Sequence, residues 1–263
     1  MGSSTISLGL GLGGGKSATS SGTSGGGGAP FANQYSVSFD GSDDYMDVNG
    51  VATDIAGMTN FSCSAWIKKD TAGSFPIIFR AASSTSTHIG FYEYNNYLVV
   101  SCNNGGSFSE AWDNGGVNIA DNQWHHVLMT YEKTGATNST VKGYVDGNLR
   151  ITNSGTGVIS SSIDEAAVGR RPNGTGGGDL YYPGLIDEMA IFNTTLSSSD
   201  VTAIYNSGVP ADISSLSPVG WWRMGDGTEA GSGATVFDMS TNSNNGTLNN
   251  IASPNGFVTD VPT

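Results

Sequence analysis

The chain has 263 residues, of which 39 are glycine and 10% are aromatic, a composition that favours many strands joined by tight turns. It carries 10 basic and 23 acidic residues, so its formal net charge is -13, which argues against nucleic-acid binding because that function needs a basic face. No apolar run reaches the roughly 18 residues that a membrane span requires, so we expect no membrane insertion.

Residues 1–30 are rich in glycine and serine, with eleven glycines and seven serines. Such a segment cannot build a core, so we expect a flexible N-terminal arm. Its apolar side chains alternate at Ile6, Leu8, Leu10 and Leu12, which predicts a strand or peg that anchors the arm on a partner protein. The segment lacks the charged and continuous apolar regions of a signal peptide.

Alternating apolar residues predict the first strands of a domain that begins at residue 31. Tyr35, Val37 and Phe39 alternate with serines and lead into an acidic turn at residues 40–44. Further strands are expected at residues 61–68, 76–80 and 90–101, with a break at Asn95-Asn96. Residues 118–132 then carry WHHVLMTYE, in which His125 and His126 lie on opposite faces.

The clearest turn signal is Asp146-Gly147, which predicts a type I′ turn between two short strands within residues 141–151. A glycine-rich loop follows at residues 169–184. Its two arginines and two tyrosines could bind a ligand or decorate the surface.

Asp187 is the unusual residue of the strand that follows this loop. Period-2 alternation places it on the same face as three apolar residues, Leu185, Met189 and Ile191. A carboxylate that points inward is costly unless hydrogen bonds or a cation compensate it. We therefore expect Asp187 to have a partner elsewhere in the chain.

One short helix is predicted after this strand. Ser197 and Asp200 form a capping box, and Gly208 ends the turn. The small apolar stripe of this helix consists of Val201, Ile204 and Tyr205.

The two cysteines, Cys63 and Cys102, are too few for a disulfide framework. Cys63 alternates with Phe61 and Ala65, which suits a small buried side chain. Whether the two cysteines pair is left open by the sequence.

Five phrases occur together in a recognisable order: FDGSDDYMDV, FSCSAWIK, WHHVLMTYE, VKGYVDGNL and GLIDEMAIFNTTLSSSDVTAIY. They resemble a laminin G-like domain of the concanavalin A-like lectin/glucanase superfamily over residues 35–208. The resemblance implies an all-β fold, a two-sheet antiparallel jelly-roll sandwich, with one short helix.

The C-terminal segment resembles the opening of such a domain. Many relatives begin with a Trp-containing strand and an Asp-Ser-Asn-Gly-Thr phrase, and similar phrases stand here at residues 220–226 and 238–248. We therefore expect an arrangement like a circular permutation, in which residues 218–263 complete one domain spanning residues 31–263.

The resemblance also implies a calcium site, because several such domains hold the ion near the FDG turn and the strand with the Asp-Glu pair. Carried over to this sequence, it nominates Asp40 and Asp187, with Asp43 or Asp44 as further ligands. Backbone carbonyls would supply the remaining oxygens. The alternative is that Asp187 accepts backbone N–H bonds and no metal is present.

The sequence does not predict an enzyme. Glycanases on this fold place several carboxylates along one strand, as in E-x-D-x-x-E, and that pattern is absent. Nucleophile elbows, phosphate loops and zinc-spaced clusters are absent as well.

A carbohydrate-binding module is one interpretation. Sugar recognition needs an aromatic platform with hydrogen-bonding groups, and five residues are candidates: Trp112, Asp113, Asn114, Tyr181 and Tyr182. Such a module could be free-standing or secreted, and therefore extracellular.

The interpretation we favour from sequence is a bacteriophage virion protein, either a capsid decoration or a fibre component, that displays this lectin-like domain. A Met start, the absence of an export signal and the long arm favour it, by resemblance only. Other virion proteins, a host-surface glycan and further copies of the chain are then the expected partners.

Overall fold

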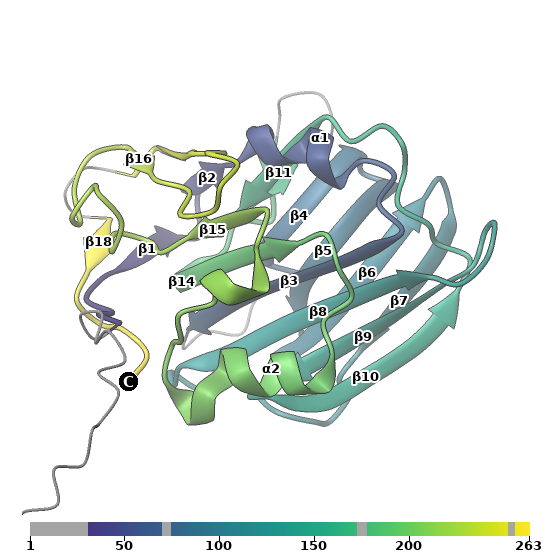
Figure 1. Ribbon diagram of the computed structural model, residues 1–263, viewed down its shortest axis with the longest axis horizontal. Coiled ribbons are helices and arrows are strands. Elements are labelled where there is room, and N and C mark those ends of the chain that lie inside the picture. The colour runs from purple at the N-terminus through teal and green to yellow at the C-terminus, as the bar shows by residue number, and fades with distance from the viewer. Residues whose placement is uncertain (1–30, 70–74, 173–177, 252–255) are drawn as a thin grey trace, which may run out of the picture. The chain divides into compact units, whose positions relative to one another are not determined.

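Two antiparallel sheets, each with eight strands among the described residues, face each other across a shared core (Figure 1). The computed structural model describes residues 31–69, 75–172, 178–251 and 256–263, so the candidate anchors Ile6, Leu8, Leu10 and Leu12 lie outside the described residues. The two-sheet sandwich expected from the sequence is confirmed.

Sheet A lies nearer the viewer in Figure 1. Its strands follow the order β10 (Asn148–Gly155), β9 (Ser139–Val145), β8 (His125–Lys133), β3 (Asn60–Lys68), β14 (Pro183–Phe192), β1 (Ser36–Asp40) and β18 (Phe257–Val258), and β15 (Gly220–Trp222) pairs with β14.

Sheet B lies behind it. Its order is β16 (Thr235–Val236), β17 (Gly246–Asn249), β2 (Tyr45–Asp47), β11 (Glu165–Val168), β4 (Ile77–Ser84), β5 (Thr87–Tyr94), β6 (Tyr97–Asn104) and β7 (Ser107–Trp112). A separate ribbon pairs β12 (Arg171–Pro172) with β13 (Gly178–Asp179).

Hairpin turns form where the sequence predicts them. Asn95 and Asn96 have φ of 49° and 73° and connect β5 to β6. Asp146 and Gly147 have φ of 51° and 74° and connect β9 to β10. Positive φ at both central residues is the requirement of a type I′ turn, which matches the twist of the flanking strands.

The core between the sheets takes alternate side chains from both. Phe61 and Cys63 enter it from sheet A, and Phe91 and Cys102 enter it from sheet B. Both cysteines are buried and free, so no disulfide joins the sheets at these residues.

Helix α2 (Ser198–Tyr205) begins at the predicted capping box, in which the Asp200 N–H donates to Ser197 Oγ and the Ser197 N–H donates to Asp200 Oδ2. The helix ends at Asn206, in the left-handed conformation, rather than at Gly208. It covers the outer face of sheet A in Figure 1, where Val201 and Ile204 join a second apolar cluster with Trp221.

One helix was not anticipated. Helix α1 (Ala52–Ile55) is a single turn that buries Ala52 and Ile55. Four residues are too few to show a helical period in sequence. Three 3-10 turns also occur, at Asn49–Val51, Asn206–Gly208 and Ser214–Leu216.

The C-terminal segment contributes strands to both sheets. β15 pairs with β14, β18 with β1, and β17 with β2, so residues 31–263 form one compact unit. Trp222 on β15 is fully buried in the core between the sheets. Within the described ranges, no helix has the length and apolar composition that crossing a bilayer requires.

A β-bulge in β14 corrects the prediction that Asp187 shares a face with Met189 and Ile191. Glu188 has a φ of 47°, and the pairing with β3 shifts between Asp187 and Ala190. The extra residue reverses the alternation, so Met189 and Ile191 enter the core while Asp187 lies on the outer face of sheet A. Asp187 is nevertheless fully buried.

Candidate functional site

The outer face of sheet B carries a row of aromatic rings. Phe75 stacks on Tyr94 with ring centroids 4.7 Å apart, and Tyr94 meets Trp112 edge-on at 6.2 Å. Phe75 is 41% exposed and Trp112 is 48% exposed. These large apolar surfaces face solvent together, which is a common property of binding surfaces.

Strand register explains how the row forms. Tyr92, Val99 and Trp112 are directly paired across β5, β6 and β7, so their side chains stand on the same face. Tyr94 follows Tyr92 by two residues and therefore projects from that face as well.

A pocket of about 230 Å³ adjoins this row. It is lined by Phe75, Ile77, Arg80, His88, Tyr92, Glu110, Arg171 and Leu180. These residues come from β4 and the segment just before it, from β5 and β7, and from the segments around the β12–β13 ribbon.

Small residues leave room for the pocket. The register aligns Arg80, Gly90, Ser101 and Glu110 across four strands, with the two smallest side chains in the middle. A side chain at Gly90 would place its Cβ 2.2 Å from the Phe79 carbonyl oxygen, so the backbone itself forms this part of the floor.

The pocket combines hydrogen-bonding groups of both kinds. The Tyr92 hydroxyl donates to Glu110 Oε2 at 3.1 Å. Arg171 donates to both carboxylate oxygens of Asp179, with 2.6 Å between Nε and Oδ1. His88 Nε2 lies 3.0 Å from the Ser101 hydroxyl, and burial together with the Arg80 charge lowers the pKa of His88 to about 3, so the ring is neutral.

Glu110 is the only carboxylic acid among the eight residues that line this pocket. Glycoside hydrolysis uses two carboxyl groups on either side of the scissile bond. The lining therefore has the groups needed to hold a polar ligand against aromatic rings, and lacks the acid pair of a glycosidase.

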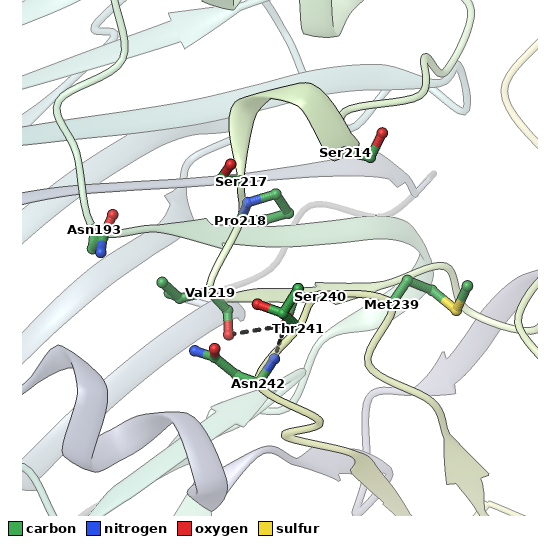
Figure 2. A pocket seen from close by; sticks show the side chains of 9 residues that line it. All are labelled: Asn193, Ser214, Ser217, Pro218, Val219, Met239, Ser240, Thr241 and Asn242. Atoms are coloured by element: carbon green, nitrogen blue, oxygen red, sulfur yellow. Dashed lines mark hydrogen bonds between the residues drawn. The ribbon is translucent and has the colours of Figure 1, made fainter.

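A second pocket, of about 330 Å³, lies beside the outer face of sheet A (Figure 2). Asn193, Ser217, Pro218 and neighbouring residues line it together with the segment from Met239 to Asn242. The Ser240 hydroxyl donates to the Val219 carbonyl at 3.2 Å, so that hydroxyl already has an internal partner. No aromatic ring or charged side chain is among its nine lining residues, which makes it a weaker candidate.

Residues 40–202 match the protein family described as the concanavalin A-like lectin/glucanases superfamily, Laminin_G_3. The chain belongs to this family. Its match covers more than half of the chain and includes every strand from β2 to β14. No curated protein matches the chain.

Two solved structures illustrate the likeness. A protein from Bacteroides ovatus, described as a candidate carbohydrate-binding protein, matches with a TM-score of 0.59 and 19% identity over 89% of this chain and 62% of its own. The CBM40 domain of the Ruminococcus gnavus IT-sialidase, solved with α2,6-sialyllactose, matches with a TM-score of 0.54 and 15% identity over 65% of this chain and 97% of its own. At these identities the likeness concerns the fold.

In this concanavalin A-like domain, the ligand-binding residues predicted from sequence do not form one site. Trp112 stands in the aromatic row, and Asn114 is exposed in the turn beyond it. Asp113 is buried and accepts from the Val117 N–H and from Arg150 Nε, both at 3.0 Å. Tyr181 is half-buried, whereas Tyr182 is wholly buried in the core and has no surface for a ligand.

Most pocket residues were missed by sequence reasoning. Phe75, Arg80, Tyr92 and Glu110 stand far apart in the sequence, and only the strand register brings them together. Arg171 belongs to the loop that the sequence did mark as a candidate ligand-binding loop. Tyr92 and Tyr94 are two residues apart and therefore share one strand face, and this spacing was the signal in the sequence for the aromatic row.

The four acidic residues nominated for calcium do not come together as a set. Asp40, Asp43 and Asp44 place one carboxylate oxygen each within 4.8 Å of one another. Asp40 pairs with Pro183, so Asp187 lies four residues further along β14, about 13 Å away at the usual rise of a strand. The first three residues remain a predicted calcium site, and Asp187 does not join them in this structure.

The three carboxylates at this turn also organise its backbone. Asp40 Oδ1 accepts from the Ser42 N–H at 2.7 Å, which lowers the pKa of Asp40, and Asp44 Oδ2 accepts from the Asp40 N–H at 3.0 Å. Burial raises the pKa of Asp44.

Asp187 has partners of its own. Its Oδ2 accepts from Asn33 Nδ2 at 2.9 Å, and its Oδ1 accepts from the Glu188 N–H at 2.7 Å. Burial and the neighbouring Glu188 raise the pKa of Asp187 well above its usual range. The partner sought for this carboxylate is therefore an amide and a backbone N–H.

Glu188 is buried beside it and bridges two residues of the C-terminal segment. Its Oε1 accepts from Arg223 Nε at 2.9 Å, and its Oε2 accepts from Trp221 Nε1 at 2.7 Å. Burial raises the pKa of Glu188 to about 7, although Arg223 opposes the shift.

Proposed function

We propose that this chain is a non-catalytic carbohydrate-binding module whose ligand lies on the outer face of sheet B. The observation that carries the proposal is the row of Phe75, Tyr94 and Trp112 beside a pocket with hydrogen-bond donors and acceptors. A sugar ring has an apolar face for an aromatic surface and hydroxyl groups for polar side chains, so both features match one ligand class.

A difference between the outer faces of the two sheets supports placing the ligand on sheet B. Much of the outer face of sheet A packs against α2 and the residues around Trp221, and the pocket beside it in Figure 2 has no aromatic ring or charged side chain in its lining. The Bacteroides ovatus and Ruminococcus gnavus proteins described above have carbohydrate-binding descriptions, and their shared fold makes the same ligand class reasonable for this chain.

The test is a glycan array followed by titration of the best ligand with two variants. Trp112→Ala removes an exposed ring of the row and should weaken binding about tenfold. Phe108→Ala is the matched control, because Phe108 is 56% exposed on the same strand and face but has no ring contact with the row among the described residues. Equal loss in both variants, or no glycan bound by the parent protein, would contradict the proposal.

We further propose that the module serves in a bacteriophage particle, as a capsid decoration or fibre component, with the N-terminal arm as its anchor. The alternating Ile6, Leu8, Leu10 and Leu12 in a Gly/Ser-rich arm favour this setting over an extracellular module. Such an arm has too little apolar surface to offset about 1 kcal/mol of backbone entropy per ordered residue without a partner.

Deleting residues 2–28 tests this setting. The shortened protein should melt at nearly the parent temperature but should fail to enter particles, and serine at the four apolar positions should have the same effect. Normal occupancy of the shortened protein on particles would show that the arm is not the anchor.

A further inference from the structure

Arg80 is a buried cation with no carboxylate partner among the described residues. It is 6% exposed, and its guanidinium donates through Nη2 to the carbonyl oxygens of Thr85 and Ser84, at 2.6 and 3.4 Å. Its Nε is buried and has no hydrogen-bond partner. A buried charge is normally compensated by an opposite charge, so this arrangement calls for an anion.

Among the remaining cations, buried Lys69 and half-buried Arg223 have carboxylate partners, whereas buried Arg170 has an unpartnered Nε, as Arg80 does. Lys69 pairs with Glu93, and Arg223 pairs with Glu188. Arg170 also lacks a carboxylate partner among the described residues, but it lies 4.2 Å from the centre of the Tyr45 ring and does not line the pocket. Arg80 differs from all of these because it lines an open pocket that a ligand can enter.

Glu110 and Asp179 lie close enough to raise the pKa of Arg80, but neither forms an ion pair with it among the described residues. Arg171 adds a second guanidinium to the lining, but Asp179 already pairs with it. Burial and the repulsion from Arg171 lower the pKa of Arg80 to about 10, so Arg80 stays protonated at neutral pH. Glu110 holds the Tyr92 hydroxyl, and neutral His88 adds no charge.

We infer that this pocket binds the carboxylate of an acidic sugar, with Arg80 as the residue that selects the acidic group. This inference rests on the proposed carbohydrate-binding function and names its ligand class. The planar guanidinium donates from a fixed fork, which suits a carboxylate, and Arg80 is the cation of this lining that has no ion pair among the described residues. Phe75 and Tyr92, which line the same pocket, supply apolar surface for the ring that carries the acid.

The pocket size is consistent with one acidic residue of a longer glycan. A volume of about 230 Å³ is below the usual range for drug-sized ligands, so it suits a single sugar unit. The neighbouring row from Tyr94 to Trp112 then extends past the pocket and can carry the following sugar.

The experiment compares matched glycans by calorimetric titration. The probes are sialyllactose and a glucuronic-acid-terminated disaccharide, lactose as the neutral partner, and a sulfated lactose as the other kind of anion. The parent protein should bind at least one carboxylate sugar about tenfold more tightly than lactose, and Arg80→Gln should remove this preference.

Three further variants serve as a conservative substitution, a fallback and a control. Arg80→Lys retains the charge but not the fork and should keep only part of the preference. Arg171→Gln, at a less buried position of the same lining, should weaken the preference and serves if Arg80→Gln does not fold. Lys142→Gln on β9 removes the same charge from sheet A and should change nothing.

Each outcome decides one point. Equal binding of acidic and neutral sugars that still depends on Trp112 would overturn the acidic-sugar inference and leave the proposed function standing. Preference for sulfated lactose alone would overturn the carboxylate assignment. If no probe binds and an array of neutral and acidic glycans is also negative, the inference and the proposed function both fail.

Discussion

Lys69 and Glu93 form an ion pair that connects the two sheets through the interior. Nζ of Lys69, the residue after β3, lies 2.6 Å from Oε2 of Glu93 on β5, and neither side chain is exposed. Glu93 Oε1 also accepts from the Asn96 N–H at 3.2 Å. The pair lies next to the residues that carry the aromatic row, because Tyr94 follows Glu93 directly.

Removing one member of this pair should lower the free energy of unfolding far more than replacing both members with apolar residues. Glu93→Ala leaves a buried ammonium group without its partner and should lower the free energy of unfolding by about 3–5 kcal/mol. The double variant Lys69→Met with Glu93→Leu should recover most of that loss, because apolar groups of similar size can replace a buried ion pair. Urea unfolding measures both, and a loss below about 1 kcal/mol in Glu93→Ala would contradict the prediction.

Stability should fall as the pH rises through the range in which Asp187 and Glu188 lose protons. The pKa of Glu188 is raised from 4.5 to about 7, and that of Asp187 is raised as well, so the folded state binds more protons than the unfolded chain in this window. Their contribution is present in full below the unfolded pKa values and is lost as the pH passes the folded values.

Asp187→Asn should therefore flatten the decline in melting temperature between about pH 5 and about pH 8. The variant can keep its hydrogen bonds, because the Asn33 amide can turn to present its buried, unpartnered Oδ1 to the new amide. Asp164→Asn, at an exposed position, is the control and should keep the parent profile. A parent melting temperature that rises with pH over this range would count against the assignment.

Calcium, if it binds at the acidic turn, should depend on Asp43. Asp43→Asn removes one carboxylate of the cluster while the described hydrogen bonds of the turn use Asp40 and Asp44. We expect calcium to raise the melting temperature of the parent protein and to have a smaller effect on this variant, because stabilisation by a bound ion disappears with its site. Equal responses in both proteins, or none in the parent, would remove this turn as a calcium site.

The C-terminal segment should be essential for folding. Ending the chain just before Pro218 removes β15 to β18 and leaves unpaired edges on β14, β2 and β1. The truncation also removes Trp222 from the core, and loss of a large buried ring typically costs about 3–5 kcal/mol. A soluble fragment of residues 31–217 that melts cooperatively would contradict this prediction.

Local features of the molecule could be predicted from the sequence. The alternation of Val37 and Phe39 places β1, the pairs Asn95-Asn96 and Asp146-Gly147 form the hairpin turns, and Ser197 begins α2. Each of these depends on neighbouring residues, through side-chain period, positive φ or a capping hydrogen bond.

Other features were decided only by the tertiary structure. The bulge at Glu188 turned Asp187 away from the core, because strand pairing with β3 determines where an extra residue is placed. The pocket depends on the cross-strand register that aligns Arg80 and Glu110 across Gly90 and Ser101, three strands apart in the sheet order. Sequence patterns report which side of a strand a residue occupies, whereas only the pairing of distant strands determines its neighbours.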